Sequence, residues 1–407
     1  MDKSMNTDAV KIIFVGDILI HSYYNKIASE GDPSFVFQKI SHALSDAEIR
    51  FGNLETVLSE KGSPIDGKGC LQGDERYIKS LNDLDFNILS LANNHTFDFG
   101  LEAFEDMSIN LQKAGIKTVG AGFNLEESRK ISTLTVNDIS LGFLAYSSRT
   151  NNGQRYATNT LPGVAPLEEE IVIEDIKKNK KDVDFLIVSL HWGIEHSPHP
   201  TPEQILFAHR VIDAGVKIII GNHPQILQGI EYYKDGLIMY SLGNFCHSDY
   251  YWEGPQKPYQ FRLKDIDRES IIVKVKLFKN GKTNIDVVPM WINSNYQPAV
   301  CEGERKDAIL QKLNARSEMI KKPDFDKYWN DLIIKKRVGN PFKIWWQNGD
   351  LLYKVKNFKF SQIKSLLDLF LMYVYVKFSK SPSKWQMFNP RNDKKPRPFC
   401  GEDEESN

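Results

Sequence analysis

The chain has 407 residues, and its 41% hydrophobic and 11% aromatic content excludes a wholly disordered protein. Its four cysteines are far apart and form no CxxC pair, which argues against a disulfide scaffold or a zinc ribbon. The net charge of −1 hides an asymmetry, since residues 1–310 carry 32 basic and 42 acidic side chains whereas residues 311–400 carry 20 and 7.

No segment has the pattern of a signal peptide or of a membrane-spanning helix. The first ten residues are polar, with Asp2, Lys3 and Asp8, and they contain no apolar core. The longest apolar run, Leu369–Val376, is far shorter than the roughly 20 residues that a spanning helix needs. We therefore expect a cytoplasmic location, with attachment to the inner face of the membrane as an open alternative.

Strands alternate with helices along most of the chain. Apolar and β-branched runs predict strands at Lys11–Val15, Glu48–Leu54, Phe86–Leu91, Ile116–Val119, Asp184–Leu190 and Val216–Ile220. Helical spacing predicts helices at Pro33–Leu44, Leu101–Ala114, Leu167–Lys178 and Pro202–Ala214. Antiparallel pairs are expected for Thr133–Thr135 with Leu141–Tyr146, Ile230–Tyr233 with Leu237–Ser241, and Ser270–Phe278 with Asn284–Trp291. This order predicts an α/β fold with antiparallel additions.

Polar side chains directly follow five of the predicted strands. They are Asp17, Asn53 with Glu55, Asn93 with Asn94 and His95, His191, and Asn222 with His223. Each one alone is explained equally well as a turn residue, a loop cap or a satisfied polar group. Five in register indicate a shared site, because loops after strand C-termini carry the ligand-binding residues of α/β sheets. Carboxylate, amide and imidazole groups suit Mn, Fe or Zn, so a metal site is predicted.

Six short motifs built on these residues occur in order: GD at 16–17, GNLET at 52–56, ANNHTFDFG at 92–100, HWGIE at 191–195, GNHP at 221–224 and SLGNF at 241–245. Together they resemble the capsule-synthesis proteins of the CapA type, which are associated with poly-gamma-glutamate and belong to the calcineurin-like metallophosphatase group. The resemblance covers about residues 11–245, extending at most to 295. It implies a four-layer α/β/β/α sandwich with a metal site at the strand ends.

The resemblance implies a role for each matching residue. It places metal ligands at Asp17, Glu55, Asn94, His191 and His223. Asn53 is the less favoured alternative to Glu55 as the ligand that bridges two metals. His95 matches the histidine that contacts the scissile phosphate or protonates the leaving group, and Asp98 could orient its imidazole. A role for Asp98 as the N-cap of the helix at 101–114 is equally open.

Two positions depart from the metallophosphatase pattern. Leu19 stands where the first motif has a histidine, and Gln225 stands where the last motif has its second histidine. The loss of two imidazoles leaves enough ligands for one firmly bound divalent metal (Mn, Fe or Zn) rather than two. Weak ligands or substrate contacts are expected from Asn53, Gln225, Asn93 and Glu195. The remaining histidines are expected to be rim or structural residues, with His21 close enough to the first motif to face the site.

The chain is expected to divide into a CapA-type metallophosphatase-like domain at 9–298, a basic, aromatic-rich helical segment at 299–388 and a disordered tail at 389–407. Cations mixed with aromatics at 335–378 suit an anionic polymer or an anionic membrane surface. The alternative is a helix that packs on the acidic body. Specific nucleic-acid binding is not expected.

The predicted function is that of a metal-dependent hydrolase of phosphoesterase or esterase type. It would act in the synthesis or tailoring of a surface polymer such as poly-gamma-glutamate or a polysaccharide, with an anionic polymer or an ester as substrate. Two alternatives stay open. One is a non-catalytic binding or assembly protein on a degenerate metallophosphatase fold, and the other is a membrane-docked accessory subunit of polymer export.

Overall fold

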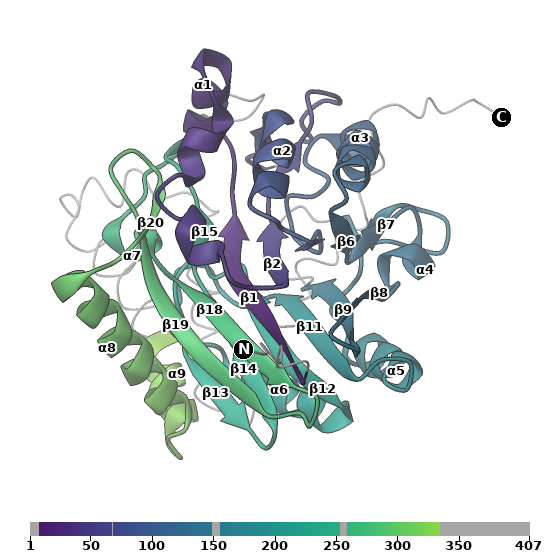
Figure 1. Ribbon diagram of the computed structural model, residues 1–407, viewed down its shortest axis with the longest axis vertical. Coiled ribbons are helices and arrows are strands. Elements are labelled where there is room, and N and C mark those ends of the chain that lie inside the picture. The colour runs from purple at the N-terminus through teal and green to yellow at the C-terminus, as the bar shows by residue number, and fades with distance from the viewer. Residues whose placement is uncertain (1–7, 67, 149–154, 253–258, 334–407) are drawn as a thin grey trace, which may run out of the picture.

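A computed structural model describes residues 8–66, 68–148, 155–252 and 259–333. Two β-sheets pack face to face, and helices cover their outer faces (Figure 1). The α/β fold class with an α/β/β/α sandwich is therefore confirmed.

The first sheet has the strand order β20-β19-β18-β1-β2-β5-β6, and β15 also pairs with β1. Neighbours among β1, β2, β5 and β6 are parallel, whereas β18, β19 and β20 are added antiparallel. The strands are β1 Ala9–Ile18, β2 Ile49–Leu54, β5 Ile88–Ser90, β6 Lys117–Val119, β15 Asn244–Cys246, β18 Glu269–Phe278, β19 Thr283–Ile292 and β20 Pro298–Val300.

The second sheet has the order β13-β14-β12-β11-β9-β8, with parallel central strands and antiparallel edges. Its strands are β8 Ser132–Val136, β9 Ile139–Ser147, β11 Phe185–His191, β12 Val216–Asn222, β13 Ile230–Tyr233 and β14 Gly236–Met239. Shorter pairs are β3 Val57–Leu58 with β4 Gln72–Gly73, β7 Ala121–Gly122 with β10 Gly163–Val164, and β16 Tyr250–Trp252 with β17 Tyr259–Phe261.

Alternating side chains on β1 supply two separate cores. Ile12 and Phe14 enter the core between the sheets, while Ile13 and Val15 enter the core beneath α1, α2 and α3. A third core lies between the second sheet and helices α5 and α6. Because both faces of the central strands are buried, their sequences are continuous apolar runs. The helices are α1 Tyr23–Glu30, α2 Arg76–Asp83, α3 Gly100–Lys113, α4 Leu125–Ser128, α5 Glu169–Asn179, α6 Pro202–Ala214, α7 Asp265–Arg268, α8 Gly303–Ile320 and α9 Phe325–Ile333.

The single helix predicted at Pro33–Leu44 is wrong. The segment forms two 3₁₀ turns, η1 Pro33–Phe37 and η2 Ser41–Leu44. The buried residues of the segment keep a helical spacing, and two short 3₁₀ turns bury them in place of one α-helix; they are Val36, Phe37, Ile40, Ala43 and Leu44. Helices α1 and α2 were not predicted.

Helices α8 and α9, beyond residue 298, pack on the body. Ile309 and Leu313 of α8 join the core between the sheets, and Ile320 joins the core around α6. None of the helices within the described ranges is both long and apolar enough to cross a membrane. The cationic stretch 335–378 and the tail 389–407 lie outside the described residues, so the predictions made for them, and the domain boundary at 298, stay predictions.

Candidate metal centre

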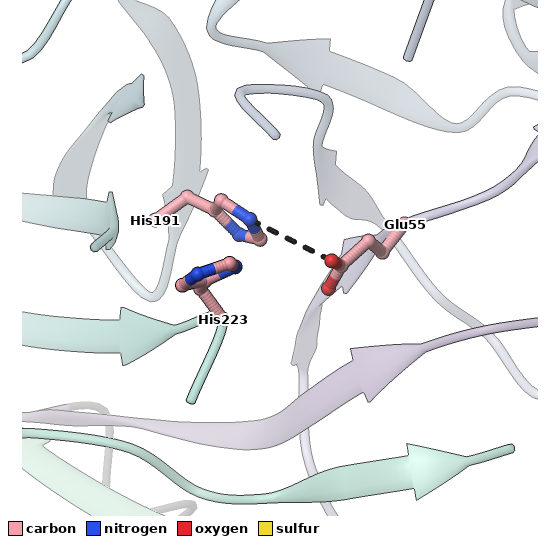
Figure 2. Close-up of side chains that lie close together, drawn as sticks. All are labelled: Glu55, His191 and His223. Carbon is pink, nitrogen blue, oxygen red and sulfur yellow. Dashed lines mark ion pairs between the residues drawn. The ribbon is translucent and has the colours of Figure 1, made fainter. Parts of the chain in front are cut away.

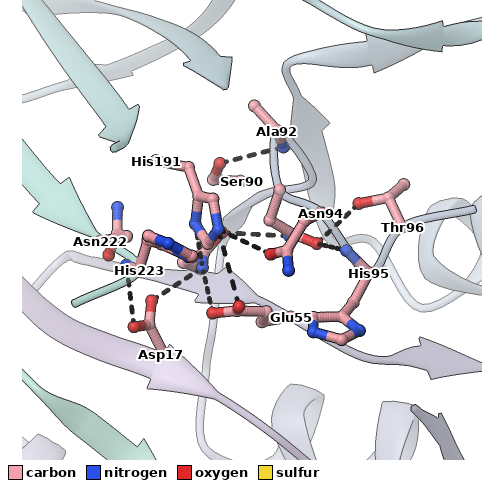
Figure 3. Close-up of polar contacts among 12 residues, drawn as sticks. Asp17, Glu55, Ser90, Ala92, Asn94, His95, Thr96, His191, Asn222 and His223 are labelled. Carbon is pink, nitrogen blue, oxygen red and sulfur yellow. Dashed lines mark hydrogen bonds and ion pairs between the residues drawn. The ribbon is translucent and has the colours of Figure 1, made fainter. Parts of the chain in front are cut away.

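The parallel strands of the two sheets end close to one another, and the candidate site lies at these ends (Figure 3). Asp17 lies in β1 and Asn53 in β2, while His191 and Asn222 are the last residues of β11 and β12. These four polar residues thus lie within the ends of the strands, whereas the other predicted site residues follow a strand; these are Glu55, Asn94, His95 and His223. Their strands bring together the side chains of Asp17, Glu55, Asn94, His95, His191 and His223 (Figure 3).

Three side chains from different strands face one another at the centre. Ligand atoms of Glu55, His191 and His223 all lie within 4.8 Å of one another, and all three residues are buried (Figure 2). Glu55 Oε1 is 3.6 Å from His191 Nε2, and the two imidazole centroids are 4.7 Å apart. One carboxylate and two imidazoles at this separation are a suitable donor set for a single divalent metal.

Two features of these three residues favour the binding of a cation: ligand atoms without hydrogen-bond partners and neutral imidazoles. Glu55 Oε1 and His223 Nδ1 are buried, and neither has a hydrogen-bond partner among the described residues. Burial lowers the pKa of His223 to about 4 and holds that of His191 well below its usual range, so both imidazoles are neutral at pH 7. Unpaired buried polar atoms are costly, and metal ligation would satisfy both.

Asp17 lies beside this triad and carries the second carboxylate. Its Oδ1 accepts a hydrogen bond of 2.8 Å from Asn53 Nδ2, and its Oδ2 accepts one of 3.1 Å from the backbone N–H of His223. Burial raises the pKa of Asp17 to about 7. Burial, followed by the nearby charge of Asp17, raises the pKa of Glu55 well above its ordinary value. Two buried carboxylates that repel each other favour the presence of a cation.

Three asparagines form hydrogen bonds with the residues of the site. Asn94 Oδ1 lies 2.8 Å from His191 Nε2 (Figure 3). Asn93 donates to the carbonyl of Leu54 at 2.8 Å and to Asn53 Oδ1 at 3.2 Å, while Asn93 Oδ1 accepts from the backbone N–H of His95 at 3.0 Å. Asn53 also donates to Glu55 Oε2 at 3.3 Å. In this arrangement Asn53 and Asn93 orient the carboxylates and the loop, and Asn94 presents its oxygen to the triad.

His95 and Asp98 form a closely bonded pair. His95 Nδ1 donates to Asp98 Oδ2 at 2.6 Å, so Nε2 is the ring nitrogen left to meet a substrate. The alternative role of Asp98 as a helix cap is wrong, because the N-cap of α3 is Phe99 and no side chain caps it. Burial lowers the pKa of His95 although the charge of Asp98 raises it, so the imidazole is neutral before substrate arrives.

The two departures from the family pattern have different surroundings. Leu19 is buried in an apolar cluster with Leu71 and Tyr250. Gln225 has a positive φ of 58°, and its backbone carbonyl accepts a hydrogen bond of 3.0 Å from Asn244. Glu195 is exposed at the rim, yet its charge contributes to the pKa values of Glu55, His95 and His223. Leu19 therefore packs in an apolar cluster at the position where the resemblance would place a metal-binding imidazole.

Histidines outside the triad make other contacts. His21 Nε2 lies 3.0 Å from His247 Nδ1, so these two buried imidazoles pair with each other. His196 Nδ1 is 3.0 Å from Asp267 Oδ1 at the rim. His199 packs edge-on against Tyr328 of α9, with ring centroids 5.3 Å apart. His209 is bonded to Glu231, and His42 is exposed.

Sequence reasoning missed Lys68, which lies against the His95–Asp98 pair. Its Nζ forms an ion pair of 2.7 Å with Asp98 Oδ1. Lys68 belongs to the loop between β3 and β4, whose described residues form no strand or helix that would give a periodic signal. Its only signal in the sequence is a lone cation between Gly67 and Gly69.

Comparison with known proteins matches the sequence of the chain to one family. The family model for the bacterial capsule synthesis protein PGA_cap matches residues 11–249. The chain is 32% identical to the PGA biosynthesis protein CapA of Bacillus subtilis (strain 168), over 79% of this chain and 81% of the relative. It is 30% identical to the capsule biosynthesis protein CapA of Bacillus anthracis, over 76% and 74%. A crystal structure of a phosphatase from Mycoplasma pneumoniae is similar at 14% identity, 70% and 94% coverage and a TM-score of 0.45, which carries no functional argument.

Proposed function

Because the chain belongs to the PGA_cap family of bacterial capsule synthesis proteins, we propose that it is a metal-dependent hydrolase of an ester linkage in an anionic capsular polymer or its precursor. One observation carries the proposal. In the triad of Glu55, His191 and His223, two buried ligand atoms have no hydrogen-bond partner among the described residues. The triad lies beside the hydrogen-bonded pair of His95 and Asp98.

The proposed metal ligands are Glu55, His191 and His223, with Asp17 and Asn94 beside them. Leu19 offers no ligand atom, which supports one firmly bound divalent ion rather than two. When bound, a divalent cation supplies Lewis acidity toward the ester and lowers the pKa of water. The two raised carboxyl pKa values would fall on binding, because a cation stabilises the charged form.

His95 is the proposed proton donor to the leaving oxygen. Asp98 fixes its Nδ1, so the proton moves at Nε2. The imidazole is neutral without substrate, and an anionic substrate would raise its pKa because negative charge stabilises the imidazolium. The role of His95 as an acid is therefore tied to a negatively charged substrate.

A capsular polymer is the proposed physiological context. The printed names of the two relatives concern PGA and capsule biosynthesis. For this chain we propose an ester on a precursor of an acidic polymer such as poly-gamma-glutamate, whose own linkages are amides, or an ester on a polysaccharide. A cytoplasmic location and docking to an anionic membrane through 335–378 stay predictions.

The proposal is tested by metal content and turnover together. Protein purified without added metal is analysed for Mn, Fe and Zn and then assayed with phosphate monoesters, phosphate diesters and carboxylic esters. His223→Ala should lose the metal and the activity, whereas His42→Ala, which changes an exposed histidine, should keep both. Full metal content in His223→Ala would disprove the assignment.

A second candidate is metal-dependent binding without turnover. It is favoured by Leu19, which packs in an apolar cluster and supplies no imidazole where the metallophosphatase pattern has a histidine ligand. The same assays distinguish the two functions. One metal per chain without hydrolysis of any ester, together with binding of the acidic polymer, would favour this second candidate.

A further inference from the structure

Lys68 is a buried cation beside the proposed proton donor, and its contacts have a definite pattern. Its side chain is only 7% exposed. The ammonium lies 2.7 Å from Asp98 Oδ1 and donates to the backbone carbonyl of Asn94. It is also 3.4 Å from His95 Nδ1, which already donates its own proton to Asp98. Lys68 thus contacts Asn94, His95 and Asp98, which belong to one turn.

The loop that carries Lys68 is attached to Asp98 at two further points. The backbone N–H of Leu71 donates to Asp98 Oδ2 at 2.7 Å, and that of Ile65 donates to the Asp98 carbonyl at 2.9 Å. The Asp98 side chain is fully buried. One carboxylate oxygen therefore receives His95 and Leu71, and the other faces the ammonium of Lys68.

The charge balance of the site explains why a cation is needed there. Asp98 is a fully buried carboxylate whose charged neighbours are His95 and Lys68, and removing one partner from a buried charge leaves the other uncompensated. The ammonium of Lys68 pairs with Asp98 and also donates to the Asn94 carbonyl. Two of its hydrogens are therefore directed to protein acceptors, and the nearby His95 Nδ1, which is itself a donor, does not accept the third.

We propose that Lys68 is a positioning residue that fixes the orientation and tautomer of His95 through Asp98. With Lys68 on Oδ1, Asp98 presents Oδ2 to His95, the imidazole proton stays on Nδ1, and Nε2 is directed to the reacting group. Because Lys68 also binds the Asn94 carbonyl, it holds the peptide that joins a proposed metal ligand to the proposed proton donor. This inference rests on the proposed function and adds a residue to it.

Kinetics of two Lys68 variants test the role. Lys68→Met keeps the length of the side chain and removes its charge, so kcat on a chromogenic phosphate ester should fall about 10- to 100-fold, the range usual for residues that orient a functional group. KM and Mn²⁺ affinity should stay within about threefold of the wild-type values, and Lys68→Arg should restore part of kcat. The control is Lys61→Met, because Lys61 is an exposed residue of the same loop that pairs with Asp106. Wild-type kcat in Lys68→Met would overturn the proposal, as would parallel losses of metal and thermal stability without rescue by arginine.

A spectroscopic measurement separates this proposal from the proposed function. Long-range ¹H–¹⁵N spectra of histidine-labelled protein report the tautomer of His95, whose signals are assigned by their loss in His95→Gln. The wild type should carry the proton on Nδ1, and Lys68→Met should shift toward a mixture of tautomers. If no ester is hydrolysed but the tautomer shifts, the hydrolase function fails and the role of Lys68 holds. An unchanged tautomer in Lys68→Met overturns the role of Lys68 whatever the activity.

Discussion

The backbone N–H of His223 donates a hydrogen bond of 3.1 Å to Oδ2 of Asp17, a residue 206 positions away in the chain. Asp17 belongs to β1 of the first sheet, and His223 directly follows β12 of the second. His223 has a φ of 93°, which a residue with a side chain rarely adopts. This bond therefore joins the two sheets at the site and holds a backbone conformation that is unfavourable by itself.

Asp17→Asn should lower Mn²⁺ affinity by at least about tenfold, because a neutral amide of the same shape attracts a cation less than a carboxylate does. Titration calorimetry on the metal-free protein measures the effect. The matched control is Asp46→Asn, an exposed aspartate that pairs with Lys11. Equal affinity in Asp17→Asn and the wild type would show that Asp17 takes no part in holding the cation.

Mn²⁺ binding should weaken as the pH falls from 8 to 6. The pKa of Asp17 is raised to about 7 by burial and that of Glu55 is raised well above its usual value, so acid keeps both carboxyls protonated and metal must displace those protons. Each displaced proton costs up to about tenfold in affinity per pH unit. The pKa of His223, lowered to about 4, keeps it neutral throughout this range. Calorimetry in two buffers of different ionisation enthalpy measures the proton release, and pH-independent binding would contradict the prediction.

Arg316→Met should destabilise the protein and loosen the segment that follows His223. Arg316 of α8 donates to the Leu227 carbonyl, and its neighbour Ser317 accepts from the backbone N–H of Ile230 at 2.8 Å. A hydrogen bond from a charged group contributes about 1.5–3 kcal/mol, and the bond of Arg316 is partly buried. Urea unfolding should show a loss of that size, together with weaker Mn²⁺ binding.

The control for Arg316→Met is Lys321→Met at the end of the same helix, where an exposed pair with Glu318 contributes less than about 1 kcal/mol. If Arg316→Met loses stability but binds Mn²⁺ like the wild type, then α8 supports the fold without positioning His223.

Acid should destabilise the fold partly through His199. Burial, followed by the charge of Arg316, lowers the pKa of His199 to about 4, whereas an unfolded histidine binds a proton near pH 6.5. The unfolded state therefore binds more protons as the pH falls through 6.5 toward 4, and stability falls by at most about 1.4 kcal/mol per pH unit. Urea unfolding at pH 7 and pH 5 should show a smaller decrease in His199→Gln than in the wild type. Equal decreases would assign the pH dependence to other groups.

Much of the fold could be predicted because buried parallel strands leave a direct record in sequence. The runs at Lys11–Val15 and Val216–Ile220 are apolar on both faces, and each proved to be a central strand. The segment at Pro33–Leu44 was predicted wrongly, because periods of three and of nearly four are hard to tell apart over so few residues. A helical segment was predicted from residue 299, but the attachment of α8 to Leu227 was not predicted, since it depends on a segment far away in the chain.

By itself, the sequence determined that chemistry-bearing residues end successive strands, because parallel strands place their C-termini at one edge and the motifs mark each end. The resemblance of these motifs to the CapA type then singled out Asp17, Glu55, Asn94, His191 and His223 as the expected ligands. Only the tertiary structure decided which groups each side chain contacts. The ion pair of Lys68 with Asp98 and the pairing of His21 with His247 join segments that no local period relates. Such contacts arise when the two sheets pack and the loops close over them, and a pattern of neighbouring residues does not encode that step.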